Sequence, residues 1–323
     1  MTASTTPRTA AARSRVAVAG AIAVVGALLL SGCGDMRDKP GAGDESAGAP
    51  AGANAPLFDK LPKRIQASKV IKVGSDIAYP PIEFKKGGKS VGLDLDLGAA
   101  LGKELGVKLE FNNSVFDALL TGMRSKRYDI AMSAMTDTKE RQEGIDPKTG
   151  KKASEGVDFI DYFSAGASLY TKKGDTKGIK GWEDLCGKKI GVQRGTVSDN
   201  FAKGESKKCE ESGKDPISIE AYDNDLEAQT RLKAGGVDAV SSDFPSAVYA
   251  AATSGGGKDF EIIGDQVAAN PYGIAVGKDD AQLRDALKAA LEAIIKNGAY
   301  EKVLKTWGVE AGAVKEVKIN GGQ

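Results

Sequence analysis

The sequence Tyr128-Asp129-Ile130-Ala131-Met132-Ser133-Ala134-Met135-Thr136-Asp137-Thr138-Lys139-Glu140-Arg141 holds a short apolar strand and, directly after it, the beginning of a helix. Residues 128–132 form the strand, and Thr136 or Thr138 is suited to cap the helix. Arg141 then falls in the first turn, where the partial charge of the helix disfavours a cation. A bound carboxylate would explain why a cation stands at the start of a helix, because the free N–H groups of the helix and a guanidinium both bind anions. The alternative is a solvated arginine beside Glu140.

Strands and helices alternate on the N-terminal side of this stretch. Short apolar strands are expected at 70–74 and 107–111, in addition to 129–132. A helix capped by Asp94 and ended by Gly106 lies between the first two strands, and a helix over 116–124 follows the second. This βαβαβ order predicts a mostly parallel sheet in an α/β protein.

A second α/β series follows the first. It comprises a strand at 188–192, helices at 201–208 and 226–234, and a strand at 237–240. The end of the first series, 126–131, resembles the end of the second, 235–240, since each has a polar break and then a strand with aspartate in second place. The pattern indicates two lobes of like construction; the alternative is that all α/β units look alike.

Two further segments complete the architecture. Residues 163–178 and 267–273 are candidate hinge strands, because a chain that crosses between two lobes twice needs them there. The stretch 280–307 is predicted to be helical, with Leu283, Leu287 and Leu291 on one apolar stripe. The tail after Gly312 is polar, and only partial order is expected of it.

Three motifs in a fixed order identify a family resemblance. They are Asp76-Ile77-Ala78-Tyr79-Pro80-Pro81-Ile82-Glu83-Phe84, the segment 133–141, and Val237-Asp238-Ala239-Val240-Ser241-Ser242-Asp243. From about Val70 to about Val309 the chain resembles the amino-acid-binding receptors of bacterial ABC importers, extracellular solute-binding protein family 3. The resemblance implies a two-lobed periplasmic-binding-protein-like fold of type II with two crossovers. Lobe 1 would be 57–168 plus 271–310, lobe 2 would be 169–270, and 311–323 would be a tail.

The resemblance also implies the binding roles of particular residues. Arg141 would hold the α-carboxylate of an amino acid, and Asp243 would hold its α-ammonium. Thr136 could add a hydroxyl, and the main chain at Ala134 and Val197 could add further hydrogen bonds. Relatives often carry hydroxyl side chains at the last two positions, which this chain lacks.

The ligand side chain would meet a group of residues drawn from both lobes. These are Asp76, Tyr79, Ile82, Glu83, Phe116 and Gln193. Two aromatic rings would flank a flat or aliphatic stem, and two carboxylates favour a polar or cationic side chain over an acidic one. Two alternatives remain open: Glu83 as a structural partner of a backbone turn, and Arg194 turned inward to select an acidic ligand.

The N-terminal sequence predicts a location outside the cytoplasm. Arg13 and Arg15 precede an apolar run at 16–30, which is shorter than the ~20 residues needed to span a bilayer and suits a signal peptide. Leu30-Ser31-Gly32-Cys33 resembles a lipobox, which implies cleavage after residue 32 and lipid attachment at Cys33, at the outer face of the cytoplasmic membrane. Residues 33–56 have the composition of a disordered tether. The alternative is an ordinary secretory signal.

Charge and cysteine content exclude several classes of protein. Without residues 1–32 the chain carries 42 basic and 44 acidic residues, unlike most nucleic-acid binders.

Outside the cytoplasm, Cys186 and Cys209 are expected to pair. In the chain-entropy model, closing the loop between them would stabilise the fold by ~3.5 kcal/mol. Free thiols are the alternative. The chain has no histidine and no Cys-x-x-Cys, so neither a metal site nor a cofactor is expected.

The predicted function is a lipid-anchored receptor, monomeric, that binds an amino acid between its lobes and delivers it to the membrane subunits of an ABC importer. Two alternatives use the same scaffold. One is an enzyme of the dehydratase or peptidoglycan-cleaving kind, with Glu83 or Asp243 as general acid. The other is a sensor subunit in which closure of the lobes signals to a receptor.

Overall fold

The computed structural model describes residues 52–147 and 149–323, which all fall within one compact unit. The predicted signal peptide, Cys33 and nearly all of the tether lie outside the described residues. Within the described ranges, no helix combines the length and the apolar character that crossing a membrane requires.

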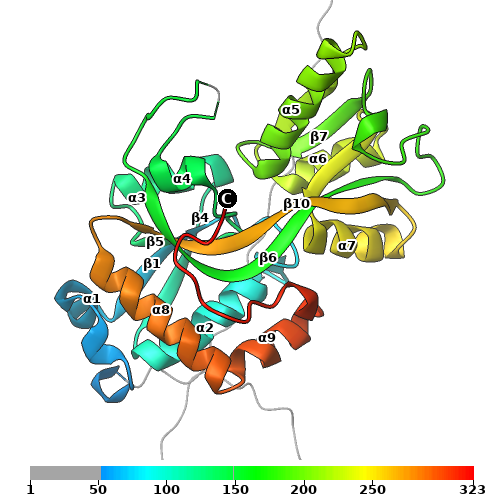
Figure 1. Ribbon diagram of the computed structural model, residues 1–323. Helices are drawn as coiled ribbons and strands as arrows, with labels where there is room; N and C mark the ends of the chain where they lie inside the picture. The colour runs from blue at the N-terminus through cyan, green and yellow to red at the C-terminus, as the bar shows by residue number, and fades with distance from the viewer. Residues whose placement is uncertain (1–51, 148) are drawn as a thin grey trace, which may run out of the picture. The chain divides into compact units, whose positions relative to one another are not determined.

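An eight-stranded sheet runs through this unit in the order β4-β1-β5-β10-β6-β9-β7-β8 (Figure 1). The strands are β1 (Val70–Ser75), β4 (Lys108–Asn113), β5 (Ile130–Ala131), β6 (Val157–Lys172), β7 (Lys189–Gln193), β8 (Ser218–Tyr222), β9 (Ala239–Asp243) and β10 (Phe260–Gly277). A separate hairpin joins β2 (Phe84–Lys86) to β3 (Lys89–Val91).

The sheet consists of two similar halves joined by two long strands. In the first half β1 lies between β4 and β5, parallel to both; in the second half β7 lies between β8 and β9 in the same way. β6 and β10 pair with each other antiparallel from end to end. The C-terminal end of β10 pairs with β5, and the C-terminal end of β6 pairs with β9. The predicted two-lobed α/β fold with two crossovers is confirmed. β6 begins and ends six residues before the predicted hinge segment 163–178, and β10 extends beyond the predicted segment 267–273 at both ends.

The helices begin largely where local sequence dictates. In the first half they are α1 (Lys63–Ser68), α2 (Leu93–Leu105), α3 (Leu119–Arg124) and α4 (Lys139–Glu143); in the second half they are α5 (Val197–Glu211), α6 (Asp225–Lys233) and α7 (Phe244–Thr253). Thr138, Thr196 and Asn224 cap α4, α5 and α6 by accepting a hydrogen bond from the backbone N–H three residues on.

The prediction that Asp94 caps a helix is wrong. Gly92 is the N-cap of α2, and it makes no side-chain cap. Asp94 lies in the first turn with its side chain fully buried, where Oδ2 accepts hydrogen bonds from Tyr162 Oη and Ala134 N. The carboxyl therefore accepts hydrogen bonds from two groups that are distant in sequence, the hydroxyl of Tyr162 and the N–H of Ala134, and not from the N–H groups at the start of α2.

The C-terminal helices return to the first half. α8 (Ala281–Lys296) and α9 (Ala299–Trp307) are separated at Gly298, which has a φ of 81° that a side chain would disfavour. Leu283, Leu287 and Leu291 are fully buried, as the apolar stripe predicts, and belong to the same hydrophobic core as α2.

The final residues are better ordered than their composition predicts. Instead of a partly ordered tail, residues 313–323 lie along β6, with isolated β-bridges from Phe163 to Ala313 and from Ile160 to Ile319. Val317 is buried in the first core. In the second half, Cys186 and Cys209 are joined, with their Cα atoms 5.6 Å apart.

Candidate functional site

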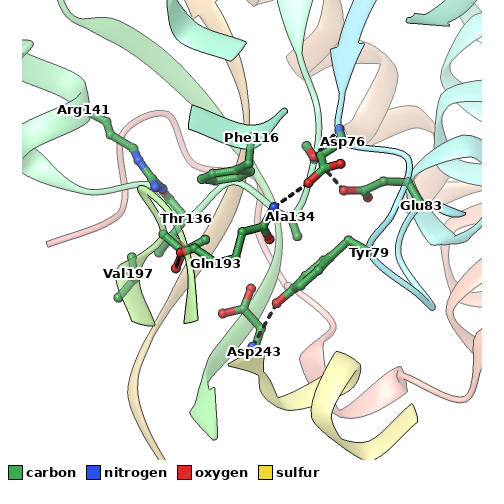
Figure 2. Close-up of a pocket in the computed structure, with 12 residues that line it drawn as sticks. Asp76, Tyr79, Glu83, Phe116, Ala134, Thr136, Arg141, Gln193, Val197 and Asp243 are labelled. Atoms are coloured by element: carbon green, nitrogen blue, oxygen red, sulfur yellow. Dashed lines mark hydrogen bonds between the residues drawn. The ribbon is translucent and has the colours of Figure 1, made fainter. Parts of the chain in front are cut away.

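A cavity lies where the carboxyl ends of the parallel strands of both halves meet. Twelve residues line it: Asp76, Tyr79, Glu83, Phe116, Ser133, Ala134, Thr136, Arg141, Gln193, Thr196, Val197 and Asp243 (Figure 2). Asp76 follows β1, Ser133 follows β5, and Gln193 and Asp243 end β7 and β9. Ligands of open α/β sheets bind at this edge, because the loops that follow the strands converge there.

Ten of the eleven residues predicted to meet the ligand line this one cavity, and Thr196, the neighbour of Val197, lines it as well. Sequence reasoning missed Ser133, although its place directly after the predicted strand was a usable signal. Ile82 was predicted to meet the ligand, but it is fully buried and does not line the cavity. Arg194 is also outside the lining: its Nη2 donates to Ala221 O over 2.7 Å, and its Nε lies 3.5 Å from Asp223.

Arg141 is half-buried at one end of the cavity. Nη1 donates to Thr136 O over 2.6 Å and Nη2 donates to Gly195 O over 3.1 Å, so the guanidinium touches both halves. Its Cζ lies 5.3 Å from the centre of the Phe116 ring, within cation–π range. Burial lowers the pKa of Arg141 to about 10, while the charges of Asp243 and Glu140 oppose the shift. The side chain is therefore a fixed cation at neutral pH.

Asp243 stands across the cavity, at the N-cap position of α7. Its backbone N donates to Tyr79 Oη over 2.9 Å, and Tyr272 Oη donates to its Oδ2 over 2.8 Å. Burial raises the pKa of Asp243 to about 6, which hydrogen bonds from the two tyrosines counteract. A cation that approached this carboxyl would favour its ionised form.

A hydrogen-bonded chain of polar groups lines the other end. Gln193 Nε2 donates to Asp76 Oδ2 and to Asp223 O. Asp76 N donates to Ser133 Oγ over 2.9 Å, and that hydroxyl donates to Glu83 Oε1 over 2.6 Å. The chain thus joins one residue of the second half to three of the first.

The surroundings of both carboxyl groups in this hydrogen-bonded series disfavour their ionised forms. Burial raises the pKa of Asp76 to about 6. Burial, followed by the neighbouring charge of Asp94, raises the pKa of Glu83 well above its usual range. Glu83 is fully buried, and its Oε2 has no hydrogen-bond partner among the described residues. The cavity therefore contains more acidic groups than its single guanidinium can neutralise.

Comparisons with known proteins match most of the described residues to one family. The model for bacterial extracellular solute-binding proteins, family 3, matches residues 71–310. The arginine-binding protein ArgT of Corynebacterium glutamicum is 31% identical over 262 residues, which cover 80% of this chain and 81% of that protein.

Two solved structures are similar as well. An ancestral arginine-binding protein bound to arginine aligns with a TM-score of 0.65 and 36% identity, over 74% of this chain and 98% of that one. An ancestral amino-acid-binding protein described as a precursor of cyclohexadienyl dehydratase also has a TM-score of 0.65, with 32% identity, 76% of this chain and 97% of that one covered. The chain belongs to the bacterial extracellular solute-binding proteins, family 3.

Proposed function

We propose that the protein is a receptor for a cationic L-amino acid, with L-arginine first among the candidates. The observation that carries this proposal is the excess of buried carboxyl groups in the cavity, where Asp76, Glu83 and Asp243 face one guanidinium, that of Arg141. With Glu83 protonated, as its raised pKa favours, Asp76, Asp243 and Arg141 leave one uncompensated negative charge, which a ligand with two positive groups and one negative group would balance. The names of ArgT and of the arginine-bound ancestral protein support the same ligand class.

The α-carboxylate of the ligand would lie between Arg141 and the beginning of α5. The first N–H groups of a helix lack partners within the helix and attract anions. Val197 and Thr196 line the cavity at the start of this 15-residue helix. Thr196 Oγ1 accepts from Asp199 N, which leaves the N–H groups nearer the cap for a ligand. Arg141 would complete a bidentate contact from the opposite side.

The α-ammonium would bind Asp243, and the ligand side chain would extend toward the acidic end. Tyr79 and Phe116 are both less than a tenth exposed and flank the space between these two regions. Asp76 and Gln193 would bind the terminal guanidinium or ammonium. Glu83 would either join them or remain a support for Ser133, the role that its short hydrogen bond favours.

Binding requires that the two halves separate first. Contacts between the halves cross the cavity at Gln193 and Asp76, at Arg141 and Gly195, and at Asp243 and Tyr79. The enclosed space is about 10 Å³, which is roughly the room that one water molecule occupies. An amino acid would therefore enter by hinge motion at β6 and β10, and closure would bury it.

Membrane attachment, the disulfide and transport are proposed as well. We propose that Cys33 carries a lipid anchor, that Cys186 and Cys209 form a disulfide in the mature protein, and that the closed form delivers its ligand to an ABC importer. Mass spectrometry of the membrane-extracted protein, with and without thiol reduction, tests the first two. Uptake of labelled arginine by cells that lack the gene tests the third, and unchanged uptake would contradict it.

An enzymatic function is the second candidate. A buried Glu83 with a raised pKa could act as a general acid, and the name of one similar structure, a precursor of cyclohexadienyl dehydratase, supports this alternative. Incubating the protein with candidate substrates and assaying for products tests this function. A time-dependent product that disappears in Glu83→Gln would replace the receptor proposal.

The principal test is calorimetric titration against the twenty amino acids, ornithine and citrulline, after unfolding and refolding to remove carried-over ligand. One-to-one binding of arginine, lysine or ornithine, tighter than that of any other amino acid, is the expected result. Preferred binding of glutamate or aspartate would contradict the acidic pocket, and no binding at all would contradict the receptor.

A further inference from the structure

The last residues of the chain are anchored by two buried carboxyl groups. Gly322 N donates to Asp137 Oδ2 over 2.8 Å, and Gly321 N donates to Asp161 Oδ2 over 3.0 Å. Asp137 is fully buried, and Asp161 is 2% exposed. Each of these buried carboxyl oxygens therefore satisfies one backbone N–H of the chain end.

Asp137 links this anchor to the binding cavity. It lies between Thr136, which lines the cavity, and Thr138, which caps α4. Its Oδ1 accepts from Nε2 of Gln142, the residue after Arg141, over 2.7 Å. Gln142 Nε2 also approaches Gly322 O at 3.4 Å. We name residues 136–142, which include most of the short helix α4, the Arg141 loop. The chain end therefore contacts this loop on both sides of the arginine.

The same segment also binds both strands that cross between the halves. Asn320 pairs with Phe159 of β6: Phe159 N donates to Asn320 Oδ1 over 2.8 Å, and Asn320 N donates to Phe159 O over 3.1 Å. Gln323 N donates to Asn270 Oδ1 on β10 over 3.3 Å. Figure 1 shows the C-terminus close to α4, with β6 and β10 beside it. The segment 320–323, which we name the C-terminal strap, thus joins the Arg141 loop to the hinge.

Two glycines allow the strap to approach this closely. A Cβ at Gly322 would lie 2.0 Å from Asp137 O, and a Cβ at Gly321 would lie 2.4 Å from Asp161 Oδ2. Neither residue has a positive φ, so it is the space, and not the backbone conformation, that demands glycine. The family model matches residues 71–310, so the strap lies outside the matched region.

We infer that the C-terminal strap and Asp137 are positioning elements that hold the Arg141 loop in its binding geometry and thereby raise ligand affinity. The inference rests on the proposed function in its choice of ligand and in the role of Arg141 as the carboxylate contact. Loss of the strap frees Gln142 and Asp137 from one partner each, and the loop that carries Arg141 loses a support against β10. The guanidinium then spends less time where the carboxylate binds.

The experiment compares the full chain with a variant lacking residues 320–323, with Gly322→Ala, and with the control Gly204→Ala. Gly204 lies in α5 with nothing within 4 Å of its Cβ position, so the same chemical change there disturbs no contact. Calorimetry with arginine gives the dissociation constant, and thermal melting without ligand gives stability. The truncated variant and Gly322→Ala are expected to bind about tenfold more weakly, or about 1.4 kcal/mol, while Gly204→Ala binds like the parent.

Hydrogen exchange of the protein without ligand provides a second readout. Faster exchange at 137–142 and 271–273 in the truncated variant is expected, even at a temperature where it is fully folded. A lower melting temperature with unchanged affinity and unchanged exchange in those segments would reduce the strap to a general stabiliser and overturn the inference. If the parent protein fails to bind arginine, the proposed function fails, and the exchange pattern alone still decides whether the strap positions the loop.

Discussion

The two halves of the sheet share one construction but contribute unequally to the cavity. In the first half, Asp129 N donates to Lys72 O and its carboxylate accepts from Lys72 N, both over 2.8 Å. In the second half, Asp238 binds Lys189 in the same two ways, over 2.8 and 2.9 Å. The sequence repeat therefore corresponds to a shared contact, which we name the aspartate clamp. An aspartate just before the last strand of each half, β5 or β9, holds the first strand, β1 or β7.

The segments that follow the strands differ much more than the strands. Eight of the twelve cavity residues come from the first half and four from the second. The first half also carries α8, α9 and the strap, whereas the second half carries the Cys186–Cys209 pair. A repeated scaffold thus leaves the binding chemistry free to vary in the loops. We expect the first half to contribute most of the ligand contacts and the second half to complete them on closure.

Replacing Arg141 by Ala gives the largest expected effect. Among the described residues that line the cavity, Arg141 is the only cation, so without it the ligand carboxylate would be buried against an uncompensated acidic surface. Truncation of one partner of a buried charge pair costs about 4 kcal/mol, or roughly a thousandfold in the dissociation constant. Calorimetry with arginine measures the loss, and Arg194→Ala is the matched control outside the cavity. Equal losses in the two variants would mean that Arg194 turns inward when ligand binds.

Asp243→Asn tests the contribution of the second half. The amide keeps the size of the side chain but cannot neutralise the α-ammonium, so arginine should bind about a hundredfold more weakly, or about 2.7 kcal/mol. Asp238→Asn, in the same half but at the clamp, should leave affinity unchanged. If Asp243→Asn weakened binding as much as Arg141→Ala, the unequal division between the halves would be wrong.

The pH dependence of affinity is expected to be smaller and to involve both halves. Asp76 and Asp243 each have a pKa raised by burial to about 6, so below pH 6 each holds a proton that a cationic ligand must displace. Affinity for arginine should therefore rise between pH 5 and 7 by about tenfold for each group, and then level off. Titrations at four pH values measure this rise. A flat profile would show that neither carboxyl meets a positive group of the ligand.

The two aspartate clamps should give the smallest effect. Asp129→Ala and Asp238→Ala each leave a strand N–H without its carboxylate partner, which costs about 1.5 kcal/mol of stability. Asp129 also pairs with Arg64, but that arginine is half exposed and adds little. Urea unfolding of the two variants should therefore give similar losses. A loss of stability in only one of the two variants would show that the clamps, although alike in geometry, do not stabilise the two halves equally.

The sequence by itself determined the alternation of strands and helices and most of the cavity. Apolar runs, Thr138 as N-cap and Gly106 as C-cap act over a few residues, so their signals are legible without the fold. Most cavity residues were predictable from the family resemblance that three motifs carry. These motifs lie near the ends of β1, β5 and β9, and a parallel sheet brings such ends to one edge.

Only the tertiary structure decided the features that depend on distant partners. The polar neighbours of Asp94 are Tyr162 and Ala134, and the hydroxyl that meets Asp243 belongs to Tyr272 on a crossing strand. The order of the last residues arises from carboxyl groups more than 150 positions away. Burial raises the pKa of Asp94, Asp161 and Asp243, and burial is a property of the packed chain that no local pattern contains.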